Sequence, residues 1–437
     1  MKKLFFALVA MAIVAVSCQK DATSNNASIE NFVFEEEVSP YAVSEENAIS
    51  HLMSVLDQIA AETRGGGKKN IVSISTVNKT DVLPSETRST ECDIPEDLLY
   101  IVSFGEGNGS AVLSADVRIN PILAILDQTV LTPEDFANNS ITRTSDNDIY
   151  DAEDLKNDIV TSIEKSAEAQ VFSSTLPMPN FPVYSEFNTV ITKIRYIPPM
   201  LDTKWGQSSP YNSAHEVPGE AMGCVPVAIA QFLYYHRWPA SGNLYGEHFD
   251  WDLMENTEIG GNPTSADYYE VSRFMYTIGE HIGAYSVEGT GIYALCGILS
   301  DLGISSSCID FDIATLSTLI ETKGPVCMRG KNTSVLYGHA WIIDGWLIQN
   351  EKFIEYKYNN IGSLIETNVL EDRTEYRIHC NFGWGGICDG YYSYSVLGFN
   401  TTYELPEEFI YTDYGDIGAS NNSQTHNFNH EFRMVTY

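Results

Sequence analysis

The apolar positions of the chain show first a helical and then a strand-like spacing. One apolar stripe predicts a helix that starts near Ser44, and its members are Ile49, Leu52, Leu56 and Ile59. Short apolar runs then predict β-strands at residues 71–77, 98–104, 110–114 and 122–126. The turn at residues 107–109 joins two of these runs as a hairpin, because Gly and Asn accept the backbone angles of a tight turn. Residues 150–172 return to helical spacing.

A proline-rich stretch at residues 176–182 interrupts this pattern and predicts a linker or an extended segment. From about Ile194 onward Trp, Gly and Tyr become denser, so we place a domain boundary near residue 193. Beyond it, the apolar run from Cys224 to His236 predicts a helix, and runs that start at Gly338 and Glu375 predict strands. The expected fold class is α+β, with domains at residues 46–193 and 194–437.

Composition and charge narrow the class of protein. The 437 residues are 43% hydrophobic and 19% charged, which is typical of a folded chain with a large core. Asp and Glu number 59 against 25 Lys and Arg, which gives a net charge of −34. Nucleic acid and a polybasic membrane contact are therefore not expected, because both need a basic surface.

The N-terminus has the pattern of an export signal. Lys2 and Lys3 precede an apolar run from Leu4 to Val16, which is long enough for a signal peptide and too short to span a bilayer. The small residues before Cys18 resemble a bacterial lipobox, so we interpret residues 1–18 as a lipoprotein signal peptide with Cys18 as the acylated residue. The alternative is a plain secretory signal with an incidental cysteine.

These features predict an exported protein with a lipid anchor in the outer membrane. Residues 19–45 are polar and acidic and predict a flexible tether. The Gln-Lys-Asp at residues 19–21 resembles the surface-export tag of Bacteroidetes lipoproteins, which adds display on the cell surface to the expectation. Seven of the eight cysteines remain beside Cys18, an odd number that leaves at least one thiol unpaired and the other pairings open: Cys92, Cys224, Cys296, Cys308, Cys327, Cys380 and Cys388.

Cys224 stands where a thiolate would be stabilised. Pro226 suits the first turn of the helix that follows, so the cysteine lies at a predicted helix N-terminus. There the helix dipole and the free N–H groups favour the charged thiolate. Gly223 lets a substrate backbone approach closely. The alternative is a small buried cysteine that begins a helix for structural reasons.

Three further motifs can complete a site around this thiol. His339 lies at the start of a predicted strand, from which it can reach a helix N-terminus across a cleft. Asn381 precedes a Gly-rich turn, and its side-chain oxygen can accept a hydrogen bond from the imidazole, which Trp384 would shield from water. Gln207 can donate to an oxyanion beside the backbone N–H of the cysteine. Each residue alone has an ordinary structural alternative.

The order Gln, Cys, His, Asn, with the Cys on a helix and the others on strands or loops, resembles that of papain-like cysteine proteases. More closely, residues 46–400 resemble the streptopain-like peptidases of family C10, with matching motifs at residues 207–212, 223–236, 338–345 and 381–390. Upstream, residues 99–104 and 112–116 resemble the propeptide of that family. The resemblance implies a papain-like catalytic domain at residues 194–437, with a helical lobe and an antiparallel β lobe, after an inhibitory α+β propeptide at residues 46–193.

The resemblance also implies a function. The chain would be the zymogen of a cysteine endopeptidase that acts on proteins or peptides without a metal or organic cofactor, with its own propeptide as inhibitor. Cleavage is expected near Lys193 and Ile194, and the mature form could then leave the anchor. Cys224 would be the nucleophile and His339 the general acid and base, with Asn381, Gln207 and Trp384 in the roles given above.

Two other functions stay open at this point. One is a different Cys-His hydrolase, such as a cell-wall amidase, and the other is a catalytically silent surface lipoprotein that binds host protein. Two features depart from the family pattern: Phe382 stands where the family often has Trp, and residues 346–374 form a longer, charged insertion. Asp344 is expected to end a strand or bind backbone rather than act as a catalytic acid.

Overall fold

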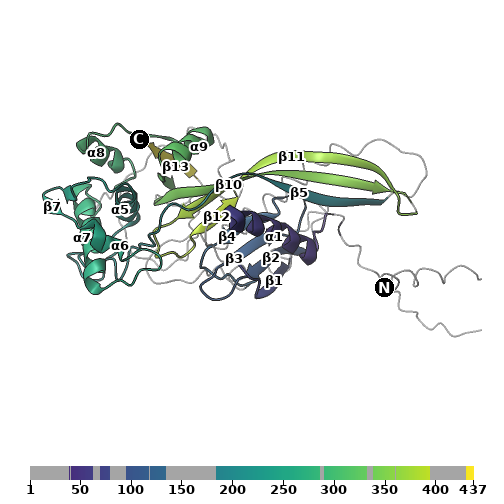
Figure 1. The fold of residues 1–437 in the computed structure, drawn as a ribbon, viewed down its shortest axis with the longest axis horizontal. Helices are drawn as coiled ribbons and strands as arrows, with labels where there is room; N and C mark the ends of the chain where they lie inside the picture. The colour runs from purple at the N-terminus through teal and green to yellow at the C-terminus, as the bar shows by residue number, and fades with distance from the viewer. Residues whose placement is uncertain are drawn as a thin grey trace, which may run out of the picture. The chain divides into compact units, whose positions relative to one another are not determined.

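In the computed structural model, the described residues are 39, 41–62, 69–78, 95–117, 119–133, 184–285, 290–331, 338–359, 361–393 and 430–437. The helix expected at residues 150–172 and the proline-rich stretch lie outside them, as do Cys18 and Cys92. Figure 1 shows the described elements, and within them one large antiparallel sheet carries most of the strands.

A helix and four strands form the first part of the described chain. Helix α1 (Glu45–Glu62) begins one residue after Ser44, as the apolar stripe predicts. Strands β1 (Ser73–Asn78), β2 (Asp97–Ser103), β3 (Ser110–Ser114) and β4 (Ile122–Leu126) follow the predicted runs, and β2 and β3 pair as the expected hairpin. Side chains on β2 alternate between two cores, so that Tyr100 packs with Leu52 of α1 while Ile101 faces the opposite core.

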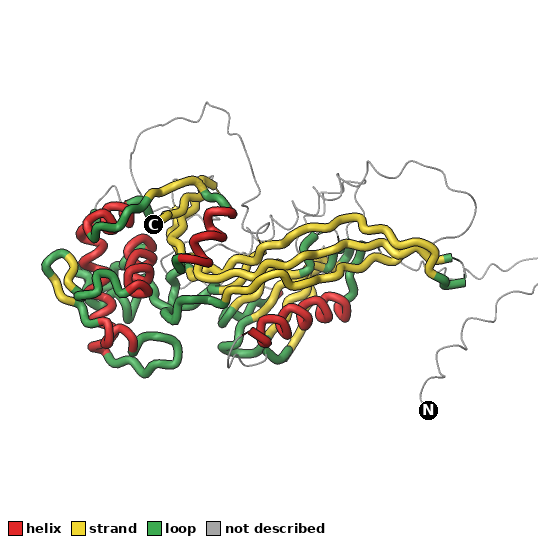
Figure 2. Tube along the Cα trace, turned by 45° about the horizontal axis from the view of Figure 1, so that its top comes forward, coloured by secondary structure: helices red, strands yellow, loops and turns green. Residues whose placement is uncertain are grey.

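The same sheet continues into the part of the chain that carries the predicted site. Its strand order is β1-β2-β3-β4-β12-β11-β10-β9-β13-β8, and Figure 2 shows these strands in yellow. The remaining strands on this path are β8 (Ser307–Asp310), β9 (Val326–Lys331), β10 (Gly338–Tyr358), β11 (Leu364–Asn381), β12 (Gly390–Ser393) and β13 (His430–Thr436). Because β4 pairs with β12, the N-terminal strands and the strand that begins beside His339 belong to one hydrogen-bonded sheet.

The charged insertion at residues 346–374 forms a long hairpin of β10 and β11. Strand β5 (Tyr184–Ile197) pairs with β10 along its other edge, from Trp346 to Tyr358. Residues 193 and 194 therefore lie inside a paired strand, and the shift in register opposite Gln349 makes residue 194 a bulge. The domain boundary near residue 193 stays a prediction.

Five helices and a two-stranded ribbon complete the described chain. The helices are α5 (Cys224–His236), α6 (Trp251–Glu255), α7 (Ser265–His281), α8 (Ala294–Asp301) and α9 (Ile313–Thr322), and the ribbon joins β6 (Asn243–Leu244) to β7 (Glu247–His248). We call α5–α8 the helical lobe and β9–β12 the sheet lobe. Helix α5 matches the predicted bounds, and nearly all of its side chains are buried, which makes it the centre of the lobe.

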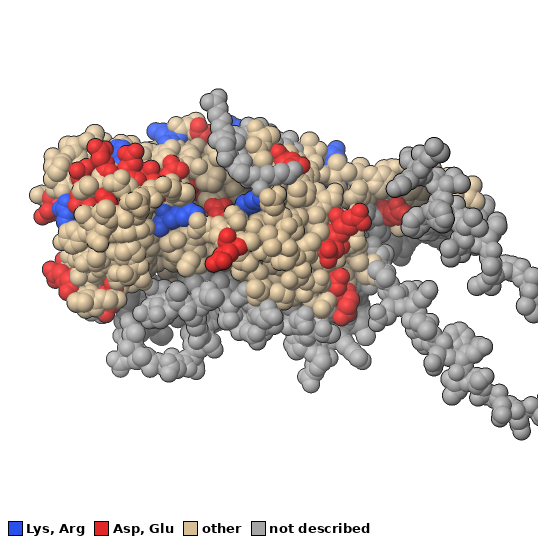
Figure 3. All heavy atoms as spheres, turned by 60° about the horizontal axis from the view of Figure 1, so that its bottom comes forward, with Lys and Arg blue, Asp and Glu red and all other residues tan. Residues whose placement is uncertain are grey.

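The arrangement confirms the expected α+β class, with a helical lobe against an antiparallel sheet. Strand β10 separates two cores, because Ala340 and Ile342 face the helical lobe while Trp341 and Ile343 face the opposite core. On the face drawn in Figure 3, acidic side chains gather in several groups, one of them over the helical lobe at the left. In the described part of the chain, none of the helices has the length and apolar character needed to cross a membrane.

Candidate active site

The thiol of Cys224 lies at the N-terminus of α5, as the sequence predicts. Gly223 is the N-cap residue and has a φ of 81°, a conformation that disfavours any residue with a Cβ. This turn presents Cys224, which is partly exposed, at the first position of a helix that is otherwise buried. The free N–H groups at the helix N-terminus and the helix dipole therefore favour a negative charge on the sulfur, and the buried helix holds them in place.

The loop that carries Gln207 is attached to both sides of the site. The Gln207 carbonyl oxygen accepts a hydrogen bond from the Met222 N–H at 2.9 Å, two residues before the thiol. The carbonyl oxygen of Trp205, in the same loop, accepts from the Gly385 N–H at 3.2 Å. The Gln207 side chain is almost fully buried. Gln207 and Cys224 are thus held near each other by backbone contacts, as an oxyanion site requires.

His339 is the second residue of β10, and its ring is buried among aromatic side chains. Nε2 lies 2.9 Å from the carbonyl oxygen of Phe382. The ring stacks on Trp384, with centroids 4.4 Å apart and planes at 27°. Burial lowers the pKa of His339 to about 4, against an opposing effect of the Phe382 hydrogen bond. The neutral ring is therefore favoured at pH 7, and since a carbonyl only accepts, Nε2 carries the proton and Nδ1 keeps its lone pair.

Asn381 ends β11 and uses its amide group to connect the sheet to α5. Its Oδ1 accepts from Gln231 Nε2 and from the Gly383 N–H, each at 3.1 Å. Its Nδ2 donates to the Thr203 carbonyl oxygen at 2.9 Å, and the Thr203 hydroxyl donates to Gln231 Oε1 at 2.7 Å. In this structure the Phe382 carbonyl is a partner of the imidazole, and the orienting role of Asn381 stays a prediction.

The turn that follows Asn381 packs directly on the helix of Cys224. A Cβ added to Gly383 would lie 2.9 Å from Val227 Cγ1, so this position excludes a side chain and lets the turn approach α5. Trp384, also in this turn, stacks on the His339 ring, and its expected role of shielding a His339–Asn381 bond stays a prediction. The structure therefore brings the motifs of Gln207, Cys224, His339 and Trp384 to one place.

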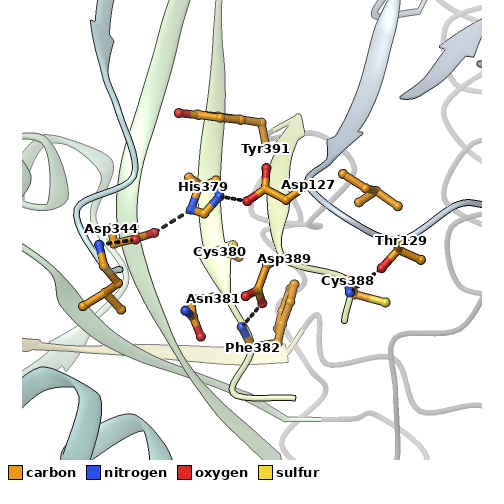
Figure 4. Close-up of polar contacts among 12 residues, drawn as sticks. Asp127, Thr129, Asp344, His379, Cys380, Asn381, Phe382, Cys388, Asp389 and Tyr391 are labelled. Atoms are coloured by element: carbon orange, nitrogen blue, oxygen red, sulfur yellow. Dashed lines mark hydrogen bonds and ion pairs between the residues drawn. The ribbon is translucent and has the colours of Figure 1, made fainter. Parts of the chain in front are cut away.

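A second, charged histidine lies beside the site, and the sequence motifs did not predict its role. His379 Nδ1 is 2.6 Å from Asp344 Oδ1, and its Nε2 is 3.2 Å from Asp127 Oδ2, as Figure 4 shows. Burial alone would lower the pKa of His379, but the two carboxylates raise it to about 10. Asp344 Oδ2 also accepts from the Leu201 N–H at 2.9 Å, which confirms the expected backbone-binding role of this aspartate.

Asp389 is another group whose role the motifs left open. Its Oδ1 accepts from the Phe382 N–H at 2.9 Å, and the side chain is buried. The sequence did contain a signal for these groups, because polar residues interrupt strands that are otherwise apolar. A polar side chain at a buried position is rarely without a hydrogen-bond partner. What the sequence lacked was the pairing of Asp127 with His379, which are 252 residues apart.

The described residues also include other cysteines and potential metal ligands. Among them, no three or more His, Cys, Asp or Glu side chains are arranged to hold a metal ion. Cys296, Cys308, Cys327 and Cys380 are free thiols. Burial raises the pKa of Cys327 and Cys380 well above the ordinary value for a thiol, so neither is a reactive thiolate at pH 7.

The geometry defines a class of site: a cysteine at the start of a buried helix, a glutamine loop bonded to the residues before it, and a histidine on an antiparallel sheet whose following turn packs on that helix. Residues 205–392 match the model of the peptidase C10 family. This part of the chain is similar to the streptopain-like domains of that family.

Individual proteins are similar to parts of the chain. Streptopain of Streptococcus pyogenes is 26% identical over 231 residues, which cover 45% of this chain and 56% of streptopain. The thiol protease/hemagglutinin PrtT of Porphyromonas gingivalis is 25% identical over 208 residues, which cover 44% of this chain and 23% of that protein. A solved fragment of prointerpain A from Prevotella intermedia is 19% identical, with a TM-score of 0.40, and the match covers 83% of this chain and 98% of the fragment. The chain thus spans about half the length of the streptopain that it matches.

Proposed function

We propose that the protein is a cysteine endopeptidase, with Cys224 as nucleophile and His339 as general acid and base. The observation that carries the proposal is the convergence of three distant motifs by backbone hydrogen bonds, from Met222 to Gln207 and from Gly385 to Trp205. The proposal is supported by the bond of the Gln207 loop to the residues just before the cysteine helix and by the stacking of Trp384 on His339. These are the parts that thiol-dependent acyl transfer requires.

The proposed reaction is hydrolysis of a peptide bond. His339, neutral because its ring is buried, takes the thiol proton at Nδ1, and the Cys224 sulfur attacks the substrate carbonyl carbon. The Cys224 backbone N–H and the Gln207 amide hold the oxyanion. The imidazolium then protonates the leaving amine, and the neutral ring next activates the water that releases the acyl group. No step uses a metal or an organic cofactor.

The natural substrates are proposed to be proteins or peptides, and the region at residues 46–193 is proposed to inhibit the enzyme until it is cut near Lys193 and Ile194. Strand β5 supports this cut site, because in the described residues it pairs only with β10 and it has a bulge at residue 194. Such a strand can detach into the extended form that a protease cleft binds. N-terminal sequencing of the mature protein tests the position, and a mature N-terminus beyond Gln207 would remove an assigned residue and overturn it.

We also propose that the protein is exported and that a lipid on Cys18 anchors it in the outer membrane. Its support is the sequence pattern alone, an apolar run of signal-peptide length that ends at this cysteine. Cys18→Ser is expected to release the protein from membranes and to leave its peptidase activity unchanged, since the residue is far from the site in sequence. Fractionation of cells and lipid labelling decide this, and a Cys18→Ser protein that stays membrane-bound would contradict the anchor.

Labelling with an E-64-type probe tests the proposed function itself. The wild-type protein should be labelled at one cysteine, and Cys224→Ala should abolish both the label and the hydrolysis of casein. Cys296→Ala is a matched control, because it removes a partly buried thiol in the same lobe that takes no part in the site. A label that survives Cys224→Ala, or wild-type protein that cleaves peptidoglycan peptides and spares casein, would reject the endopeptidase.

A further inference from the structure

The backbone of Phe382 is held by hydrogen bonds at both its carbonyl oxygen and its N–H. Its carbonyl oxygen lies 2.9 Å from His339 Nε2, and its N–H donates to Asp389 Oδ1 at 2.9 Å. Figure 4 shows the second of these contacts, with Asp389 pointing at the Phe382 nitrogen. The two groups belong to successive peptide planes that meet at the Phe382 Cα, so a buried carboxyl group holds the residue whose carbonyl oxygen contacts the imidazole of the site.

The fold fixes Asp389 at this place. The side chain is 2% exposed, and the residue lies directly before β12. Its carbonyl oxygen accepts from the Asp127 N–H at 2.9 Å, at the end of β4. The neighbouring Cys388 N–H donates to the Thr129 hydroxyl at 2.8 Å. The backbone around the carboxyl group is thus tied to the segment that follows β4, and the side chain is buried.

We infer that Asp389 is a positioning residue for His339 and acts through the backbone of Phe382. The inference rests on the proposed function, in which His339 exchanges protons with the thiol. An ionised acceptor on the Phe382 N–H holds the backbone of this residue in place, and with it the direction of the carbonyl oxygen. A well-aligned bond to Nε2 keeps the proton there and holds Nδ1 toward the thiol. Asp389 itself touches neither the substrate nor the reacting atoms.

The surroundings of Asp389 give this role a pH dependence. Burial, the largest effect, raises the pKa of Asp389 to about 7, while the Phe382 N–H and His379 lower it and the two other aspartates raise it. The titratable groups that face it come from β4, β10, β11 and β12, and they are Asp127, Asp344, His379, Cys380 and Tyr392. As the pH falls through about 7, the carboxylate takes a proton and its hold on the Phe382 N–H weakens. The titration of His339 lies lower, at about 4, so the two effects separate.

Two substitutions test the inference on the full chain, produced and processed as the wild type is. Asp389→Leu removes the acceptor, and Asp389→Asn keeps an amide oxygen at its position without the charge. Since displacement of a reacting group by about 1 Å can cost about 10²-fold in rate, we expect Asp389→Leu to lower kcat by about 10- to 100-fold with little change in KM. Asp389→Asn should lose about 3- to 10-fold and lack the decline in kcat that wild type shows below about pH 7.

A matched control and a second measurement keep the test decisive. Asp267→Asn changes another buried aspartate that accepts a backbone N–H, that of Thr264 in the helical lobe, and it should leave the pH profile of kcat unchanged. In the full chain, ¹⁵N NMR of labelled histidine reports the His339 ring directly. The wild-type ring should carry its proton on Nε2, and Asp389→Asn should shift that signal.

Each outcome decides one question. If wild type hydrolyses casein and Asp389→Asn keeps both the wild-type kcat and the decline near pH 7, the inference is wrong and the proposed function stands. If wild type hydrolyses nothing, the proposed function fails. The His339 ¹⁵N signal still tests whether Asp389 positions His339. A shift of this signal in Asp389→Asn supports that role, and an unchanged signal rejects it. If Asp389→Leu does not fold, Asp389→Asn alone carries the test.

Discussion

The two sides of the candidate site are stabilised in different ways. Cys224 belongs to one continuous helix whose other side chains are almost all apolar and buried, and that helix is held mainly by the apolar core of the helical lobe. His339 contacts the Phe382 carbonyl, and Asp389 accepts from the N–H of the same residue. In the same sheet, His379 is ion-paired with the buried Asp344 and the partly exposed Asp127. The helix side is an apolar core with one reactive atom at its end, and the sheet side is a network of polar groups from distant strands.

This difference has a consequence for how each side fails. An apolar core loses stability in small steps as its packing worsens, because the hydrophobic effect is roughly proportional to area. A buried polar network fails abruptly when one partner is removed, since the remaining group stays buried without compensation. The sheet side should therefore be the more sensitive to single substitutions and to pH.

The largest effect is expected from the two reacting groups. Cys224→Ala and His339→Ala should each lower casein hydrolysis by several orders of magnitude, because removal of a nucleophile or its base leaves little catalysis. On the helix side the loss should come without a change in stability, so the melting temperature of Cys224→Ala should stay within a few degrees of wild type. Near-wild-type hydrolysis by either variant would contradict the assignment of the pair.

The next effect concerns stability on the sheet side. His379→Leu should lower the free energy of unfolding by about 3–5 kcal/mol in urea, the usual cost of removing one partner of a buried ion pair. His281→Gln is a control, because that histidine is largely exposed beside Asp301 and such pairs contribute about 0–1 kcal/mol. A loss as small as that of the control would mean that the network does not stabilise the sheet.

The two histidines of the sheet should also respond to pH in opposite directions. The pKa of His379 is raised to about 10, so its contribution is full below about pH 6.5 and is lost as the pH rises toward 10. The pKa of His339 is lowered to about 4, so its contribution is present above about pH 6.5 and is lost as the pH falls toward 4. Unfolding free energies of wild type, His379→Leu and His339→Ala across pH 4–10 test both signs. The same slope in wild type and variant would refute the corresponding shift.

Gln207 tests the loop that joins the two sides. Gln207→Ala should lower kcat by about 10²–10³-fold, the scale of one oxyanion donor. Its backbone bond to Met222 does not need the side chain, so stability should change little. Ser208→Ala, at the exposed next position, is the control and should keep full activity. A loss below about tenfold in Gln207→Ala would mean that its amide is not an oxyanion donor.

The sequence predicted the helix side more fully than the sheet side. The bounds of α5 follow from an apolar run, a proline and a glycine, all within a few residues, and local rules reach that far. The strands β3 and β4 were also predicted at their observed bounds. The hydrogen bond from His339 to the Phe382 carbonyl oxygen could not be predicted. Every residue type has a backbone carbonyl, so the sequence does not indicate which one accepts. The pairing of β4 with β12, which brings Asp127 to His379, depends on register between distant segments.

The smallest predicted effect lies at the connection between the two sides. Gln231 and Asn381 are joined across the lobes, and both also bind Thr203. If Asn381 acts mainly through this connection, Asn381→Ala and Gln231→Leu should each lower the free energy of unfolding by about 1–3 kcal/mol, because each leaves buried groups unpaired. Each variant should also lower kcat by about tenfold or less. In the double variant the two losses should fall short of their sum, because one removal already breaks the shared bond.

The double-mutant cycle also separates the two roles of Asn381. An asparagine that orients the imidazole directly would lower kcat by the same factor whether or not Gln231 is present, and the melting temperature would not follow the loss. An asparagine that ties α5 to the sheet would lose its effect on kcat once Gln231→Leu has removed the tie. Full additivity in kcat would therefore restore the orienting role predicted from the sequence, and strong coupling would make Asn381 part of the structure that holds the helix and sheet sides together.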